Sequence, residues 1–198
     1  NLATAGISAV TAGTSNFVAG VNAGNSIESG GNYNTVVGDE AGTAITTGDY
    51  NVGLGYRALL ANTTGTQNTS IGTDTLRAND TGTNNTGVGQ AALFANTTAS
   101  NNTGIGHSAL RNNTTGAFNA ALGAEALLTN TAGASNTAVG YQSLKLATTA
   151  SNNTSMGYRA LRTTTTGANN VAIGSSALYA NTTGTENVSV GANSMLAN

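Results

Sequence analysis

The stretch SNTAVGYQSL at 135–144 contains the pattern that decides the fold, because that pattern returns at every seventeenth position. Written from its Asn, the unit reads N-T-[AGS]-[VIL]-G-x-x-A-L-x-x-N-T-T-G-x-x. Its first glycine recurs without insertion or deletion at Gly38, Gly55, Gly72, Gly89, Gly106, Gly123, Gly140, Gly157, Gly174 and Gly191. Repetition at a fixed period is the signature of a repeat architecture.

The length of the unit predicts the class of repeat. Seventeen residues are too few for the helix pairs of ankyrin or tetratricopeptide arrays, which need about 33. They suit one coil of a parallel β-solenoid with two or three short strands. We therefore expect an all-β rod of about eleven coils, which at ~4.8 Å per rung is roughly 50 Å long.

The repeats predict one domain over residues 1–198. Ten regular repeats cover 34–198, and an irregular coil covers 16–33, longer than the others by one residue near Gly30-Gly31. Residues 1–15 match part of a further coil. In that partial coil, the residues that match the Leu, middle and late-Gly columns of the repeat are Ile7, Val10 and Gly13.

Two apolar columns are interpreted as the interior of the solenoid. Alternation in a strand puts Thr137 and Val139 on one face and Ala138 on the other. The first apolar column precedes the glycine and holds Val37, Leu54, Ile71, Val88, Ile105, Leu122, Val139, Met156, Ile173 and Val190. The second holds Leu59, Leu76, Leu93, Leu110, Leu127, Leu144, Leu161, Leu178 and Met195, with Gly42 as the exception.

The first position of the repeat is always Asn, which predicts a ladder of stacked carboxamides running from rung to rung. Its members in the regular coils after Asn34 are Asn51, Asn68, Asn85, Asn102, Asn119, Asn136, Asn153, Asn170 and Asn187. A row of Asn that binds a ligand is the minor alternative. The Asn-Thr-Thr-Gly stretches at 62–65, 113–116 and 181–184 predict a turn whose glycine takes a positive φ. Ala99 and Ala150 replace that glycine twice.

Composition excludes several classes of protein. Charged residues make up 7% of the chain against a usual ~25%. No cysteine is present, which rules out cysteine-ligated zinc and disulfide scaffolds and leaves the compartment open. Six basic residues and a net charge of -2 are too little for a nucleic-acid-binding stripe. No apolar run approaches the ~18 residues of a membrane span, and no signal peptide is visible.

The segment NNVAIGSSAL at 169–178 resembles the head repeats of YadA-like trimeric autotransporter adhesins, as do ENVSVGANSM at 186–195 and SNTAVGYQSL at 135–144. The longer unit, with its Asn/Thr-rich turn, is similar to repeats of phage tail-fibre shafts. The resemblance implies a left-handed β-roll, three chains about a common axis, and an extracellular location on a virion tail fibre or a bacterial surface. It also implies a host-surface glycan or protein receptor as a partner. The adhesin units are shorter than the unit of this chain, which leaves the cross-section of the coil open.

The column preceding the first apolar one is small and predicts the subunit interface, because small side chains permit another backbone to approach closely. After Val36 it never exceeds serine in size. Its central members are Gly53, Ser70, Gly87, Gly104, Ala121, Ala138 and Ser155. The alternative is that small outward residues merely avoid aggregation.

Catalytic chemistry is not expected. His107 is the only histidine, and no cysteine or acid stands at metal-ligand spacing from it. Asp39 and Glu40 are adjacent in sequence, so an extended strand sends them to opposite faces, whereas acid–base pairs must converge. We therefore predict no enzyme activity, no cofactor and no metal.

Surface columns predict contacts between rungs. Glu40 and Arg57 are opposite charges on neighbouring coils. Arg77 and Arg111 stand one rung either side of Phe94, at cation–π spacing. The alternative reading is a sugar-binding stripe in which aromatic side chains stack on a ligand, namely Tyr141, Tyr158 and Tyr179.

The resulting expectation is a structural rod or head segment of a trimeric extracellular fibre, with a self-assembling extracellular filament as a close variant. An ice-binding solenoid is the alternative, but it needs Thr at alternate positions of one strand in every coil. Thr63 and Thr64 are adjacent, and the Thr-Gly-Thr pattern fails at Ala117, Ala134 and Ala168. A polysaccharide depolymerase would need convergent acids that the repeats do not offer.

Overall fold

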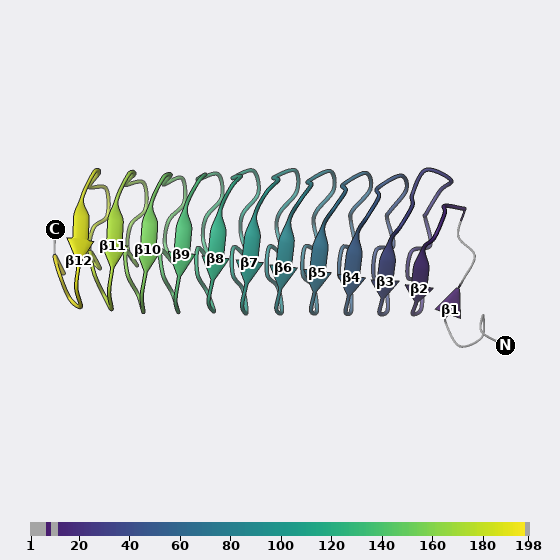
Figure 1. The fold of residues 1–198 in the computed structure, drawn as a ribbon, viewed down its shortest axis with the longest axis horizontal. Coiled ribbons are helices and arrows are strands. Elements are labelled where there is room, and N and C mark those ends of the chain that lie inside the picture. Colours follow the sequence, from purple (N-terminus) through teal and green to yellow (C-terminus); the bar gives the residue numbers. More distant parts are fainter. Residues whose placement is uncertain (1–6, 9–11, 197–198) are drawn as a thin grey trace.

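The computed structural model describes residues 7–8 and 12–196, and it confirms an all-β solenoid in which each coil is one sequence repeat. Figure 1 shows one short strand per coil, side by side along a rod. The strands are β1 (Ile7–Ser8), β2 (Phe17–Ala19), β3 (Thr35–Val37), β4 (Val52–Leu54), β5 (Thr69–Ile71), β6 (Thr86–Val88), β7 (Thr103–Ile105), β8 (Ala120–Leu122), β9 (Thr137–Val139), β10 (Thr154–Met156), β11 (Val171–Ile173) and β12 (Val188–Val190). No helix occurs in the described ranges.

The strands form a single sheet in sequence order, and β2 to β12 are all parallel. Thr137 pairs with Thr154, so the register advances by one repeat per rung. Each strand from β2 to β12 ends after three residues, and a glycine follows it. At Gly106, φ is 130° and a Cβ would lie 2.7 Å from the carbonyl of Gly123 on the next coil, so only glycine fits.

The irregular coil follows the expectation from sequence. Glu28 donates its backbone N–H to Thr46, a spacing one residue longer than the repeat, whereas Asn32 donates to the carboxylate of Asp49 at the spacing of the repeat. The extra residue therefore lies between Glu28 and Asn32, next to Gly30. The expected partial coil at the N-terminus is wrong at Ile7, which pairs antiparallel with Ala19 instead of joining the Leu column. Val10 lies outside the described residues.

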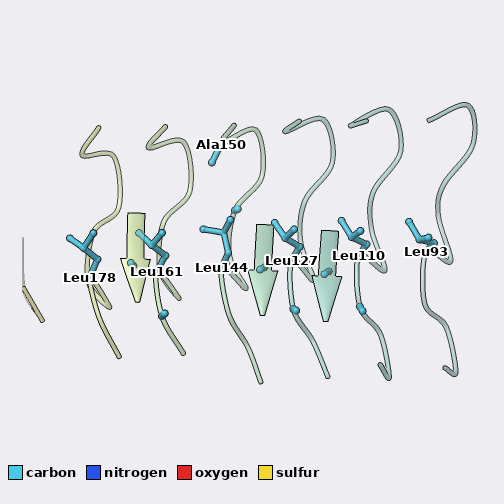
Figure 2. Packing of buried hydrophobic residues seen from close by; sticks show 14 of the residues in the cluster. Leu93, Leu110, Leu127, Leu144, Ala150, Leu161 and Leu178 are labelled. Atoms are coloured by element: carbon cyan, nitrogen blue, oxygen red, sulfur yellow. The ribbon is translucent and has the colours of Figure 1, made fainter. Parts of the chain in front are cut away.

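The Leu column is buried as predicted, but the other apolar column is not. Leu59 through Leu178 are fully buried, whereas Met195 at the end of the column is 40% exposed and departs from the prediction. Figure 2 shows the leucines from Leu93 to Leu178 stacked one per coil. Ile105 and Leu122, by contrast, are each 40% exposed, so the column before the glycine faces outward. The interior side of each strand is its middle residue, which is buried in every strand from β2 to β12.

This finding overturns the predicted subunit interface. The small column lies inside the coil, beneath the leucines, and cannot meet another chain. Its members Gly53, Ser70, Gly87, Gly104, Ala121, Ala138 and Ser155 are all buried. A Cβ on Gly104 would lie 3.3 Å from Cγ of Leu93, which shows that the leucine occupies the space a larger residue would need.

The first coils fill the same lumen with a different set of residues. Val36 replaces the small residue, Gly42 replaces Leu, and Ile45 replaces the Asn of the Asn-Thr-Thr-Gly turn. All three are buried, with Val18 and Ile27 playing the same parts one coil earlier. A Cβ on Gly42 would lie 2.7 Å from Cγ1 of Val36. The larger residues Val36 and Ile45 therefore fill the space that is left where Gly42 replaces the leucine. Cores accept such combined substitutions when the total volume is conserved.

Candidate functional site

The Asn column forms the predicted ladder, and it lies inside the rod. Each Asn from Asn51 to Asn187 donates its backbone N–H to the Oδ1 of the Asn one coil before it, at 2.9–3.0 Å. The Nδ2 groups of Asn51 to Asn170 also donate to a carbonyl within their own coil, as Asn51 does to Gly65 at 2.9 Å, whereas Nδ2 of Asn187 donates to Oδ1 of Asn170. These side chains are buried or nearly so, which makes the column a structural ladder and removes the ligand-binding alternative for it.

A second Asn ladder, which the sequence reasoning missed, runs through the Asn-Thr-Thr-Gly turns. Nδ2 of Asn79 donates to Oδ1 of Asn62 at 2.6 Å, and the same contact repeats up to Asn130. The turn carbonyl joins the two ladders: Gly65 accepts from both Asn51 and Asn62. The recurrence of this Asn in five consecutive repeats, from Asn62 to Asn130, was the available signal.

These turns differ from the prediction in one respect. Gly65 does not take a positive φ, and the left-handed residue is Gln67, two positions later, with φ 59°. A Cβ on Gly65 would lie 2.5 Å from the carbonyl oxygen of Gly82, so this glycine permits close approach of the next coil. Several of these turns begin with Asn-x-Thr, the acceptor sequence for N-glycosylation, as at Asn62, Asn96 and Asn181. Asn62, Asn96 and Asn181 are buried with bonded amides, so the folded rod does not present them for glycosylation.

The outer face of the sheet carries two columns, which we call the sheet face: the first and third residues of β3 to β12. The third position is always aliphatic or Met, and Ile71, Ile105 and Ile173 are 38–40% exposed. The first position is Thr in six strands, namely Thr35, Thr69, Thr86, Thr103, Thr137 and Thr154. The remaining strands have Val52, Ala120, Val171 and Val188 there. A continuous apolar row of this length is the kind of surface that marks association in soluble proteins.

The corner that follows the strands carries the basic side chains together with some of the acidic and aromatic ones. Arg57 pairs with Glu40 at 2.7 Å, as expected from their neighbouring rungs, and this contact raises the pKa of Arg57. The predicted cation–π contacts of Phe94, which we call the Phe94 sandwich, are also confirmed. The guanidinium carbons of Arg77 and Arg111 lie 5.3 and 5.1 Å from the centroid of its ring.

Further along the same corner, Glu125 accepts from Lys145 at 2.7 Å and from Gln142 at 2.9 Å. These hydrogen bonds hold the pKa of Glu125 below its ordinary value. Tyr141 and Tyr158 stack on one another with centroids 5.7 Å apart. The expected tyrosine row is therefore partly assembled, while Tyr179 lies beside Arg162 and not on the stack.

His107 is exposed on this corner. Within residues 7–8 and 12–196, no three metal-ligating side chains come together. The same ranges contain no helix of the length and apolarity that crossing a bilayer requires.

Comparison with known proteins adds no relative. No family model, no curated protein and no solved structure matches this chain.

Proposed function

We propose that this chain is a structural segment of an extracellular fibre, in which copies of the rod associate through the sheet face. The observation that carries the proposal is the outward aliphatic column of β3 to β12. In a lone chain this column leaves an apolar row exposed along the whole rod. Burying it would stabilise an assembly by about 25 cal/mol for each Å² of apolar surface removed from water.

Three copies fit this surface. The constant register places one side chain of this aliphatic column on every rung, an arrangement that suits three rows meeting along one axis. The repeats at 135–144 and 169–178 resemble those of trimeric adhesins and tail fibres, which supports three chains, an extracellular location and contact with a host surface. The interface of this proposal uses the aliphatic column, not the buried small column.

Light scattering on the purified chain tests the proposal. The expected mass is three times that of the 19.4 kDa chain. The double variant I71D/I105D should remain folded by circular dichroism, because both side chains face outward, and should have the mass of one chain. The matched control T98D/T115D places the same charges on exposed turn residues and should stay trimeric. A parent chain that is monomeric in solution would contradict the proposal.

One observation favours a second candidate, an ice-binding solenoid. The Thr-x-aliphatic strands, such as Thr69 with Ile71 and Thr103 with Ile105, project both side chains outward from a regular sheet. The adjacent threonines of the turns do not form such an array, whereas the threonines at the first position of the strands recur at a constant spacing. Val52, Ala120 and Val171 interrupt the Thr row, which favours the fibre. A thermal-hysteresis measurement separates the two functions, because a trimer that buries the sheet face cannot present it to ice.

A further inference from the structure

All six basic residues of the chain lie on the corner that follows the strands: Arg57, Arg77, Arg111, Lys145, Arg159 and Arg162. Carboxylates neutralise three of them, since Glu40 pairs with Arg57, Asp74 with Arg77 and Glu125 with Lys145. Arg111 lies over the ring of Phe94. Arg159 and Arg162 have no carboxylate of the described residues within ion-pair distance. Three positive charges therefore lack a carboxylate partner, and two of these, Arg159 and Arg162, lie close enough to share one acceptor.

One side chain holds these two guanidinium groups together. The Nε atoms of Arg159 and Arg162 both donate to Oε1 of Gln142, each at 3.1 Å. Gln142 is itself fixed, because its Nε2 donates to Glu125 at 2.9 Å and to the hydroxyl of Tyr141 at 3.0 Å. Bringing two like charges to one acceptor costs Coulomb energy that an anion between them would offset. The arrangement is thus preorganised for a negative ligand.

The Nη atoms supply the free donors. Nη1 of Arg162 donates to the hydroxyl of Tyr179 at 3.1 Å, while the Nη groups of Arg159 have no hydrogen-bond partner among the described residues. A guanidinium binds a carboxylate through two parallel N–H donors, which gives both strength and direction.

Aromatic rings flank the same two arginines. Tyr141 and Tyr158 are 42% and 47% exposed and stack on one another, and the guanidinium of Arg159 lies 4.8 Å from the ring centroid of Tyr158. Tyrosine offers an apolar face and a polar hydroxyl, a combination that suits ligands with both kinds of surface. A sugar ring has apolar C–H faces and hydroxyls at its rim.

We propose that Arg159, Arg162 and the adjoining tyrosines 141, 158 and 179 bind a carboxylated sugar within an acidic glycan. The guanidinium groups take the carboxylate, and the tyrosine rings take the face of the sugar. A nucleic acid is a poorer fit, because Arg57, Arg77 and Lys145 pair with carboxylates and a single further cation, Arg111, gives no run of phosphate contacts. The site deepens the proposed fibre function by naming the class of receptor. It lies on residues that follow the strands, outside the sheet face.

Binding of alginate, a linear polyuronate, tests this site on the intact chain, with neutral dextran and dextran sulfate as comparison polymers. We expect alginate to bind and dextran not to bind. The variant R159Q/R162Q should weaken alginate binding at least tenfold, and Y141A/Y158A should weaken it as well. R111Q removes a cation of the same corner outside the site and serves as the matched control, with unchanged binding.

Two results would overturn the site: no binding of alginate by the parent, or equal loss in R111Q and R159Q/R162Q. Tighter binding of dextran sulfate than of alginate, indifferent to the tyrosine substitutions, would also overturn it, because only general attraction of polyanions would remain. The mass of the R159Q/R162Q assembly, measured by light scattering, distinguishes the glycan site from the proposed association of the rods. It should equal that of the parent, and a monomeric parent that still binds alginate would leave the site standing without the fibre.

Discussion

The Oδ1 atom of Asn130 has no hydrogen-bond partner, because Ala147 occupies the position where the next Asn of the second ladder would stand. In every earlier coil of that ladder, Oδ1 accepts from the following Nδ2, as Asn113 accepts from Asn130 at 2.7 Å. The carbonyl of Ala150 likewise accepts from Asn136 alone, whereas Gly133 accepts from both ladders. The second ladder thus contains a local defect with an identifiable cause at Asn130.

The double variant Ala147→Asn/Thr164→Asn should repair this defect, because Thr164 in the next coil has no Nδ2 to donate to the new Oδ1 at position 147. The new Nδ2 at position 147 would donate to Asn130 and to the carbonyl of Ala150, and the pair Asn96 with Ala99 shows that this combination of residues fits one coil. We expect the free energy of unfolding to rise by about 1 kcal/mol, measured by urea denaturation. Ala147→Asp/Thr164→Asn has the same shape without the donor at position 147 and should destabilise the rod. Stabilisation by both variants would show that the cavity, and not the hydrogen bond, matters.

Phe118→Asn should relieve backbone strain in the exposed turn that precedes β8. Phe118 has φ 60° and is 64% exposed, and the equivalent position is already Asn at Asn84, Asn101, Asn152 and Asn169. A left-handed conformation costs an L-residue roughly 1–2 kcal/mol, and Asn tolerates it better than an aromatic residue. The denaturation midpoint should therefore rise. Phe118→Val, which is β-branched, should lower it, and the reverse order of the two variants would contradict the argument.

The same substitution at two adjacent residues tests which side of the strand is interior. Gly104→Leu places a side chain against Leu93 and the carbonyl of Ala109, so we expect a loss of about 1–3 kcal/mol from overpacking. Thr103→Leu projects outward from the same strand and should leave the melting temperature of the rod unchanged or higher. Equal destabilisation in the two variants would mean that the strand is buried on both faces.

Acid should weaken the corner at Glu125. Its pKa is lowered in the folded state, chiefly by hydrogen bonds from Lys145 and Gln142, so the folded state binds its proton less readily than the unfolded chain does. The resulting stability is complete above the ordinary pKa of 4.5 and is lost as the pH falls through the folded value. Glu125→Gln should reduce the acid-induced drop in stability by less than about 1 kcal/mol, because the pair is partly exposed. Denaturation midpoints between pH 6 and pH 3 would measure it, and an identical drop in both proteins would refute the assignment.

Much of the architecture could be predicted from the sequence, because equivalent residues of successive repeats must stack in columns along the rod. The constant spacing forces residues such as Asn119 and Asn136 onto neighbouring rungs, so the Asn ladder and the Phe94 sandwich follow from register alone. The inserted residue near Gly30 follows from the same spacing. None of these contacts requires knowledge of how the coil closes.

Which face of each strand points into the coil, in contrast, was decided only by the tertiary structure. Alternation separates Gly104 from Ile105 but does not say which one faces the lumen, and hydrophobicity favours the wrong residue. The lumen is already filled by Leu93 from one side of the coil and by the two Asn ladders from the others, so only a small residue fits beneath it. The larger aliphatic residues are therefore forced outward, onto the surface through which we propose that the rods associate. Where the chain supplies Val36 in place of the small residue, Gly42 vacates the leucine position, which is the same volume limit acting in the opposite direction.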